Sequence, residues 1–348
     1  MRRIAFAVPG DIMTLTGGYA YDRRIILELK RLGWQVDAMT LGEGYPWPSE
    51  TTRAAAYRRL SVISADTTIV IDGLALGALP DIGARVRPPH PIVALVHHPL
   101  ALESGLSVVH AAVLRESERA ALSAAVRVVT TSETTARCLI AGYAVPADRI
   151  VVAAPGVDSC PIARAGADEI VSLLSVGALA PRKGYDTLIA ALAKLADLPW
   201  RLAIAGDRNR DPRTSRELEA SIVECGLSNR ISLLGAVTSL QLEELFLSAD
   251  LFVLASRFEG YGMAFAEAIA HGLPVIGTTA GAIPDTAPVG AGVFVPSEDV
   301  DALANALRLL IENQAERGKL AAGAREAIPY LPRWSDSARK FARALETI

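Results

Sequence analysis

Short apolar runs alternate with helix-like segments along the whole chain. Residues 4–8, IAFAV, are apolar at every position, and apolar residues recur at helical spacing in residues 21–33 until Gly33. Runs that are apolar on both faces are typical of buried parallel strands. Further runs of this kind occupy residues 34–41, 68–73, 91–98, 126–132 and 149–156. The first part of the chain is therefore predicted to be an α/β domain.

The pattern starts again after a polar segment that contains Gly and Pro, residues 156–169. A second series of apolar runs follows at 170–177, 200–207, 231–237, 250–256 and 273–279. Two successive βα series predict two doubly wound, Rossmann-like domains that face each other across a cleft. We place the boundary between residues 158 and 159.

Composition excludes several classes of protein. The 348 residues are 51% hydrophobic with a net charge of −3, which indicates a globular chain with sizeable cores. Residues 1–150 hold 16 Lys and Arg against 14 Asp and Glu, and the rest hold 19 against 24, so neither half has the basic excess of a nucleic-acid binder. Three scattered cysteines form no disulfide framework, and no apolar run reaches the roughly 20 residues of a membrane span. A cytoplasmic location is expected, and peripheral contact with a membrane stays open.

Two loops of the first domain carry candidate chemistry, because ligands of open parallel sheets lie beyond the carboxyl ends of the strands. Gly17 and Gly18 precede a helix and would let backbone amides approach an anion or a sugar, although a tight turn explains them equally well. His97 and His98 leave the end of a strand, where a functional and a structural role are both open.

Two loops of the second domain carry charged residues. Arg182 and Lys183 stand just before Gly184 and a helix, an unfavourable place for cations unless an anion lies between them and the helix amides. A phosphate would be such an anion, and a solvated basic loop is the alternative. Glu259 precedes the next helix and Glu267 lies inside it. A phosphate on the helix N-terminus, with a carboxylate on each side for hydroxyl groups, fits a nucleotide sugar.

These residues resemble the retaining glycosyltransferases of GT-B fold grouped as family four, and the resemblance covers nearly the whole chain. The E-x7-E motif of that family matches Glu259 and Glu267, its Lys-Gly phosphate loop matches Lys183-Gly184, and its early Gly-rich loop matches Gly17-Gly18. The resemblance implies an acceptor-binding domain over residues 1–158, a donor-binding domain over 159–332, and a C-terminal helix, 333–348, that packs back on the first domain.

The resemblance also implies roles for single residues. Glu259 would hold sugar hydroxyls, Glu267 the ribose and Lys183 the diphosphate, while His97 would contact the sugar. His97 and Glu259 are the catalytic candidates. The donor-binding candidates are Gly17, Gly18, Arg182, Lys183, Gly260, Tyr261, Gly262, Met263, Ala264 and Glu267.

The sequence departs from the family pattern in three places. Ala178 stands where the phosphate loop of the family has Arg, and Arg182 is our candidate replacement. The segment PGVD lacks the usual Asn, and Asp285 stands where Glu is usual. The first departure concerns the second cation for the diphosphate.

The implied reaction is hexosyl transfer from a nucleotide-diphosphate sugar with retention of configuration, by a front-face route in which the leaving phosphate helps to deprotonate the acceptor. No metal or other cofactor is expected, because Arg182, Lys183 and helix amides would stabilise the charge that develops on the diphosphate. The one Asp-x-Asp, Asp299 to Asp301, stands at a predicted helix start, which favours capping over metal binding.

Two other functions fit parts of the pattern. A sugar-nucleotide epimerase of GT-B fold would hold the same diphosphate but would need no acceptor. A non-catalytic nucleotide-sugar-binding protein would not need Lys183, His97 and both glutamates together. The acceptor, a small molecule, glycan or lipid, is expected to contact residues 18–21 and 98–104 of the first domain, where no motif identifies it.

Overall fold

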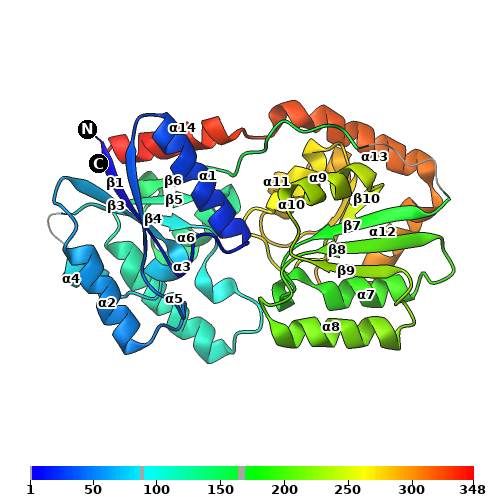
Figure 1. Ribbon diagram of the computed structural model, residues 1–348, viewed down its shortest axis with the longest axis horizontal. Coiled ribbons are helices and arrows are strands. Elements are labelled where there is room, and N and C mark those ends of the chain that lie inside the picture. Colours follow the sequence, from blue (N-terminus) through cyan, green and yellow to red (C-terminus); the bar gives the residue numbers. More distant parts are fainter. Residues whose placement is uncertain (1, 87–89, 164–168) are drawn as a thin grey trace. The chain divides into compact units, whose positions relative to one another are not determined.

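The computed structural model describes residues 2–86, 90–163 and 169–348, so residues 164–168 of the predicted interdomain segment lie outside the described part. The chain divides into two units, Met1–Gly156 with Pro332–Ile348, and Val157–Leu331. Each unit is built on one six-stranded sheet whose strands all pair in parallel. Helices cover the sheets (Figure 1). The predicted α/β class with two doubly wound sheets is confirmed.

The first sheet has the strand order β2-β1-β3-β4-β5-β6. Its strands are β1 (Arg3–Val8), β2 (Gln35–Thr40), β3 (Thr67–Asp72), β4 (Ile92–Val96), β5 (Arg127–Thr130) and β6 (Ile150–Val152). Strand β4 is buried at every position, as its unbroken apolar run predicts. The chain leaves β1 outward to β2 and then returns to β3, so the crevice for a ligand is expected beyond the carboxyl ends of β1 and β3.

Helix α1 (Gly17–Arg31) packs beside the C-terminal helix α14 (Trp334–Glu346) in the first unit (Figure 1). The ring of Phe341 on α14 lies 6.5 Å from the ring of Phe6 on β1, so the last helix completes the core of this unit. The remaining helical segments are α2 (Glu50–Ser61), α3 (Gly73–Leu76), α4 (Ile82–Val86), α5 (Val108–Ser123), α6 (Glu133–Tyr143), and the 3-10 turns η1 (Leu100–Leu102) and η2 (Ala147–Arg149).

The second sheet has the order β12-β11-β10-β7-β8-β9. Its strands are β7 (Val171–Val176), β8 (Trp200–Ala205), β9 (Ile231–Gly235), β10 (Leu251–Val253), β11 (Val275–Thr278) and β12 (Gly292–Val295). The direction of strand addition reverses between β7 and β10, so loops that follow these two strands flank the expected ligand crevice of this sheet. Strand β12 was not anticipated from the sequence, since it is only four residues long and begins with Gly292.

Helices α7 (Tyr185–Ala193) and α8 (Pro212–Glu224) lie on one side of this sheet, and α9 (Ser239–Ser248) and α10 (Met263–Ala270) lie on the other (Figure 1). The other segments are α11 (Ile283–Thr286), α12 (Val300–Glu312), α13 (Gln314–Ala327), and the 3-10 turns η3 (Pro181–Lys183), η4 (Val289–Ala291) and η5 (Ile328–Tyr330). At the start of α12, Asp299 Oδ1 accepts a hydrogen bond of 2.9 Å from the amide of Ala302, which confirms the predicted cap.

Among the described residues, no helix combines the length and the apolar character that crossing a membrane requires.

Candidate functional site

In the second unit, the loop after β7 and the loop after β10 lie in close contact, at the point where the direction of strand addition reverses. Gly184 ends the loop after β7 with φ of +63°, and a Cβ on this residue would lie 2.0 Å from the carbonyl oxygen of Ala255. Only glycine therefore allows both this left-handed backbone and this close approach. The Lys-Gly pair of the sequence motif thus has a structural reason: Gly184 brings the chain at Lys183 against the loop that follows β10.

Glu259 is the centre of a cluster of polar side chains between these loops. Its Oε1 accepts hydrogen bonds of 2.6 Å from Lys183 Nζ and of 2.6 Å from Ser256 Oγ, and Arg182 lies 3.2 Å from its Oε2. Glu259 is only 6% exposed. Burial raises the pKa of this carboxyl group, but Lys183 and Arg182 outweigh burial and lower the pKa to about 2. The carboxylate is therefore ionised at every physiological pH.

The two cations at the start of α7 thus contact a carboxylate of the protein itself. The sequence indicated that an anion should lie near Arg182 and Lys183. Arg182 also donates a hydrogen bond of 2.7 Å to the carbonyl oxygen of Phe258, so its guanidinium is directed toward the loop after β10. Ala178, in the position of the family Arg, has no charge, and Arg182 is the cation that this structure places beside Lys183 and Glu259.

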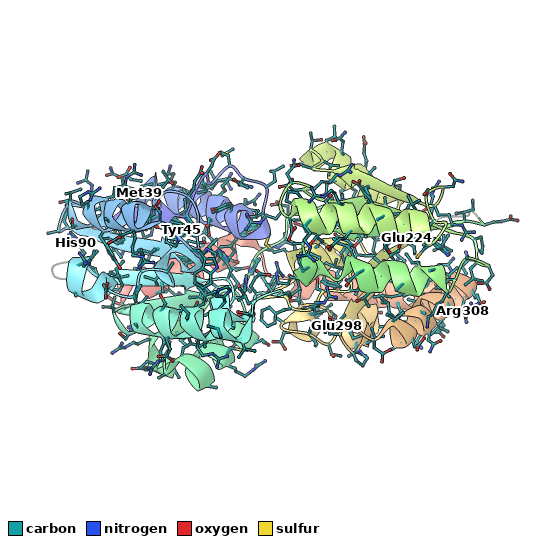
Figure 2. All side chains as sticks on the ribbon, turned by 90° about the horizontal axis from the view of Figure 1, so that it is seen from below. Met39, Tyr45, His90, Glu224, Glu298 and Arg308 are labelled. Atoms are coloured by element: carbon teal, nitrogen blue, oxygen red, sulfur yellow. The ribbon has the colours of Figure 1, made fainter. Side chains whose placement is uncertain are left out.

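Arg257 fastens the same two loops to each other. Its Nε lies 2.9 Å from Glu298 Oε1 and its Nη2 lies 2.7 Å from Asp186 Oδ2, while Nη1 donates to the carbonyl oxygen of Pro181. Its backbone amide donates to the carbonyl oxygen of Arg182 at 2.8 Å. Glu298, which is labelled in Figure 2, lies in the turn between β12 and α12. Planar guanidinium groups suit such multiple contacts, and sequence reasoning gave Arg257 no role.

Helix α10 begins beside this cluster with backbone amides that can donate hydrogen bonds to an anion. Gly262 precedes the helix with φ of +94°, and the amides of Phe265 and Ala266 bond to its carbonyl oxygen. The amides of Met263 and Ala264 come first in the helix, and no acceptor for them is found in the described part of the chain. A helix N-terminus with two such amides is a place where phosphates bind.

The turn from Glu259 to α10 is fixed by contacts with the segment that follows β11. A Cβ on Gly281, which has φ of +61°, would lie 2.3 Å from the carbonyl oxygen of Glu259, and the amide of Ala282 donates to that oxygen at 2.9 Å. The carbonyl oxygen of Tyr261 accepts a hydrogen bond from Thr286. Tyr261 itself is half-buried, and Gly260 is buried. These contacts fix the direction in which α10 presents its first amides.

Glu267 lies within α10, one helix turn beyond the first amides. Its side chain is half-buried, and among the described residues no hydrogen bond or ion pair to its carboxylate is found. Burial raises the pKa of this carboxyl group to about 7, and the nearby charge of Asp158 adds to the rise. Unlike Glu259, Glu267 thus has no cation among the described residues that lowers its pKa.

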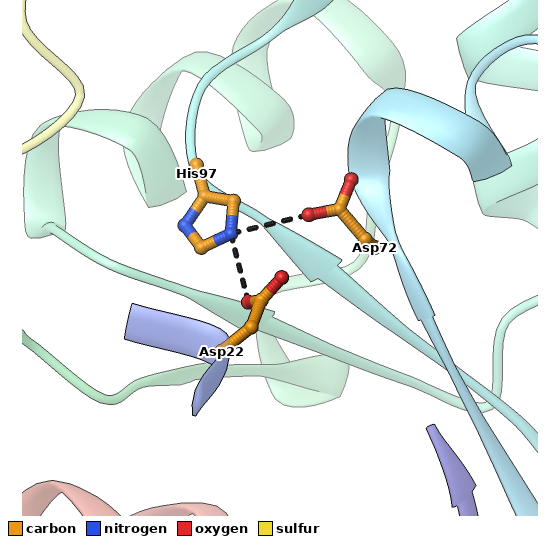
Figure 3. A group of neighbouring side chains, drawn as sticks. All are labelled: Asp22, Asp72 and His97. Atoms are coloured by element: carbon orange, nitrogen blue, oxygen red, sulfur yellow. Dashed lines mark hydrogen bonds and ion pairs between the residues drawn. The ribbon is translucent and has the colours of Figure 1, made fainter. Parts of the chain in front are cut away.

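In the first unit, the structure brings His97 together with two aspartates that sequence reasoning did not single out. His97 Nε2 lies 3.1 Å from Asp22 Oδ1 and 3.3 Å from Asp72 Oδ2 (Figure 3). Asp22 belongs to α1, Asp72 is the last residue of β3, and His97 follows β4. The two aspartates are buried, and they come from elements far apart in the sequence, so no local motif could reveal them.

The Gly-Gly loop reaches the same place. Gly17 and Gly18 are the first residues of α1, and a Cβ on Gly18 would lie 3.3 Å from Cδ2 of His97. The hydroxyl of Thr16 caps the helix by accepting from the amide of Tyr19. Gly18 therefore lets the backbone at the start of α1 lie against the imidazole ring, beyond what a tight turn alone requires.

Tyr21 does not offer a surface to an acceptor, although it lies in the segment expected to contact one. It is fully buried, and its hydroxyl donates a hydrogen bond of 2.7 Å to the carbonyl oxygen of Ala153. His98 is half-buried and lies 3.4 Å from Glu103. Of the expected acceptor segments, 98–104 thus contains a polar pair, His98 and Glu103, near the surface, whereas Tyr21 belongs to the core.

Comparison with known proteins gives matches over both units. The model of the family described as Glycosyltransferase Family 4 matches residues 21–159, and the model described as Glycosyl transferases group 1 matches residues 167–327. Together they cover the two units with little interruption.

Curated relatives are similar over parts of their length. The D-inositol 3-phosphate glycosyltransferase of Xylanimonas cellulosilytica is 31% identical over 227 residues, which cover 60% of this chain and 54% of that protein. The MMP α-(1→4)-mannosyltransferase of Mycolicibacterium hassiacum is 26% identical over 322 residues, 87% of this chain and 76% of that protein. The chain thus spans about half the length of several curated relatives that it matches.

Solved structures match the fold over almost the whole chain. Sucrose-phosphate synthase from Thermosynechococcus elongatus has a TM-score of 0.84 at 21% identity, with 99% of both chains covered. HepE of Anabaena, solved in complex with UDP-glucose, has a TM-score of 0.80 at 18% identity, with 100% of both chains covered. With both family models matched and the fold shared, the chain belongs to the group 1 glycosyltransferases, family four, of GT-B fold.

Proposed function

We propose that this protein transfers a hexosyl group from a nucleotide-diphosphate sugar to an acceptor hydroxyl, with retention of the anomeric configuration. The observation that supports the proposal most is the arrangement in the second unit, where Lys183 and Arg182 lie on one side of Glu259 and the first amides of α10 follow it. This arrangement combines positive groups for a diphosphate with a carboxylate for sugar hydroxyls.

The roles follow from the environment of each group. Lys183, Arg182 and the amides of Met263 and Ala264 would stabilise the negative charge that develops on the leaving diphosphate, without a metal ion. Glu259, ionised and fixed by its partners, would accept hydrogen bonds from the transferred sugar. Glu267 would accept from the ribose. The leaving phosphate would take the acceptor proton on the same face as the departing bond, which retains the configuration.

The donor class has support from relatives. HepE has been solved with UDP and with UDP-glucose, and two mannosyltransferase relatives are named as GDP-mannose-dependent. A nucleotide sugar of this kind is the donor we propose here, with an acceptor that carries a free hydroxyl. We also propose a cytoplasmic location.

A thermal-shift screen with UDP, GDP, ADP and dTDP, followed by the matching nucleotide sugars, tests the donor site, because a ligand that binds only the folded state raises the apparent stability. NMR spectroscopy of the product then tests the reaction, since an α-linked donor should give an α-linked product. A stabilising donor that is epimerised without an acceptor would contradict transfer, and a screen without any shift would contradict the donor site.

A further inference from the structure

The imidazole of His97 lies between two buried carboxylates for which the proposed reaction has no direct use. Asp22 is fully buried and Asp72 is 3% exposed, whereas the side chain of His97 is 19% exposed. Both aspartates approach the same ring nitrogen, Nε2. Figure 3 shows the other ring nitrogen, Nδ1, on the side of the ring away from both carboxylates. The aspartates are thus too deep to serve a substrate directly, but His97 is not.

We propose that Asp22 and Asp72 are positioning residues that fix the ring of His97 through Nε2–H and keep it a cation, so that Nδ1–H is presented to the ligand as a charged donor. The catalytic part of this inference rests on the proposed function. The protonation state of His97 does not depend on it. The inference assigns roles to two residues that no sequence motif marks.

The ring is also held by packing. The ring of Tyr21 meets it edge-on, with centroids 5.3 Å apart and an interplanar angle of 82°. The backbone of Gly18 lies close to Cδ2, where even a Cβ would come within 3.3 Å. Thr131 donates a hydrogen bond of 3.0 Å to the carbonyl oxygen of His97, which fixes the backbone. These contacts restrain rotation of the ring, so Nδ1 stays on the side away from the two carboxylates (Figure 3).

The charges that face His97 favour the imidazolium form. Helix α1 contributes Asp22 and the phenol of Tyr21, and β3 contributes Asp72, while the contact from the segment after β5 is the hydroxyl of Thr131. Burial lowers the pKa of His97, but the two carboxylates outweigh burial and raise the pKa well above its ordinary value. Nδ1 then carries a proton at neutral pH and can only donate.

Two carboxylates on one nitrogen exceed what orientation alone needs. Asp22 Oδ2 is buried without a hydrogen-bond partner, which is costly in a folded protein. Burial raises the pKa of Asp22, the imidazolium of His97 opposes this rise, and Asp72 adds to it. Two carboxylates beside one imidazole have a physical reason if they keep His97 protonated, because each raises its pKa. A charged Nδ1–H would form a stronger hydrogen bond to a sugar or phosphate oxygen than a neutral ring could.

Histidine NMR spectroscopy of the protein alone tests the state of His97. The five histidines are followed from pH 5 to 10, and His97→Gln identifies the signal of His97. We expect His97 to stay imidazolium to at least about pH 8.5, and Asp22→Asn or Asp72→Asn to lower its pKa by about 1 to 3. Asp66→Asn, which removes an exposed carboxylate next to the other end of β3, is the matched control and should leave the signal unchanged.

The pH dependence of kcat tests the catalytic consequence, with the nucleotide sugar that the screen identifies. The wild type should keep its kcat from pH 6 to 8.5, whereas Asp22→Asn should lose about tenfold per pH unit above its lowered pKa and approach the wild type near pH 6. A structural defect would not be repaired by acid. If no donor is turned over by the wild type, the proposed function fails while the NMR result still decides the state of His97.

Three results would overturn the proposal. One is a His97 that titrates near its ordinary value in the wild type, and another is a loss of kcat in Asp22→Asn that is the same at every pH. The third is a divalent cation bound in equimolar amount to the purified protein and lost in Asp72→Asn, because the three side chains would then be metal ligands.

Discussion

Lys183 Nζ lies 2.6 Å from Glu259 Oε1, so the cation of the Lys-Gly motif and the first carboxylate of the E-x7-E motif form one ion pair in this structure. Arg182 lies 3.2 Å from the other oxygen of the same carboxylate. A buried carboxylate with two cationic partners keeps both cations in place before a diphosphate arrives. The cluster has a net positive charge, which favours binding of an anion nearby.

Lys183→Ala should weaken binding of the stabilising nucleoside diphosphate by about 1.5 to 3 kcal/mol, the range of a lost charge-assisted hydrogen bond. Isothermal titration calorimetry measures the change. Lys194→Ala is the matched control, because Lys194 is an exposed lysine of the same unit that pairs with Asp301. Unchanged affinity in Lys183→Ala would refute the phosphate-loop assignment. Arg182→Ala should cause a comparable loss if Arg182 replaces the cation missing at Ala178.

Arg257→Lys should weaken diphosphate binding about 3- to 10-fold, although Arg257 faces Asp186 and Glu298 rather than the proposed ligand. A lysine cannot bridge both carboxylates and the carbonyl oxygen of Pro181, so the loop that carries Lys183 should lose its fixed position. Titration calorimetry gives the affinity. The control is Arg308→Lys, because Arg308 also bridges two acidic residues, on α12 and before β8, and should show no change. Equal effects in both variants would argue against a loop clamp.

The sequence was sufficient for the elements with strong local signals. The all-apolar run of β4 and the Gly-bounded helix α10 have the predicted positions. Gly184 could be recognised from its motif, and the structure supplies its reason in the approach to Ala255. Strand β12 was missed because four residues with a leading glycine carry too weak a pattern.

Contacts between distant segments could not be predicted in the same way. Asp22 stands within an ordinary amphipathic helix, and nothing in its neighbourhood indicates that it meets His97. The pairing of Lys183 with Glu259 joins residues 76 positions apart. Periodicity indicates which face of an element is buried, but not which polar group on another element lies opposite. The chemistry of the loops was therefore visible in the sequence, whereas their internal ion pairs were not.

Glu118→Gln should stabilise the first unit at alkaline pH. Glu118 is 1% exposed, it accepts a hydrogen bond of 3.0 Å from the amide of Leu100, and burial raises its pKa to about 8. Because the pKa is higher in the folded than in the unfolded chain, the folded state favours the protonated form. That contribution is complete below about pH 4 and is lost as the pH rises through about 8.

The expected gain in unfolding free energy for Glu118→Gln is on the order of 2 kcal/mol at pH 9 and near zero at pH 4.5. Thermal melts across this range measure it. Glu116→Gln, an exposed position on the same helix, should show no such trend. A Glu118→Gln variant that melts below the wild type at pH 9 would mean that the ionised carboxylate is stabilising.

Affinity for the nucleoside diphosphate should rise between pH 6 and 8 through Glu267. Burial and Asp158 raise the pKa of this carboxyl group to about 7, and ribose hydroxyls would donate to its ionised form. Binding should therefore release a fraction of a proton at pH 7, which calorimetry in two buffers of different ionisation enthalpy detects. In Glu267→Gln the ligand phosphate still titrates but residue 267 does not, so this variant is the control. The same proton release in wild type and variant would exclude Glu267 as the source.

Glu259→Gln and Glu267→Gln should have different effects, because the two residues are proposed to contact opposite ends of the donor. Glu259→Gln removes the charge that would strengthen hydrogen bonds to the transferred sugar, so kcat should fall. The free diphosphate has no sugar at that place and should bind almost normally, because Lys183 and Arg182 lose a carboxylate that fixes their position but that also competes with the ligand. Glu267→Gln should weaken the diphosphate and the nucleotide sugar alike, because both contain the ribose. Titration of both ligands into both variants decides the assignment: an equal loss for the two ligands in Glu259→Gln would mean that Glu259 does not contact the sugar.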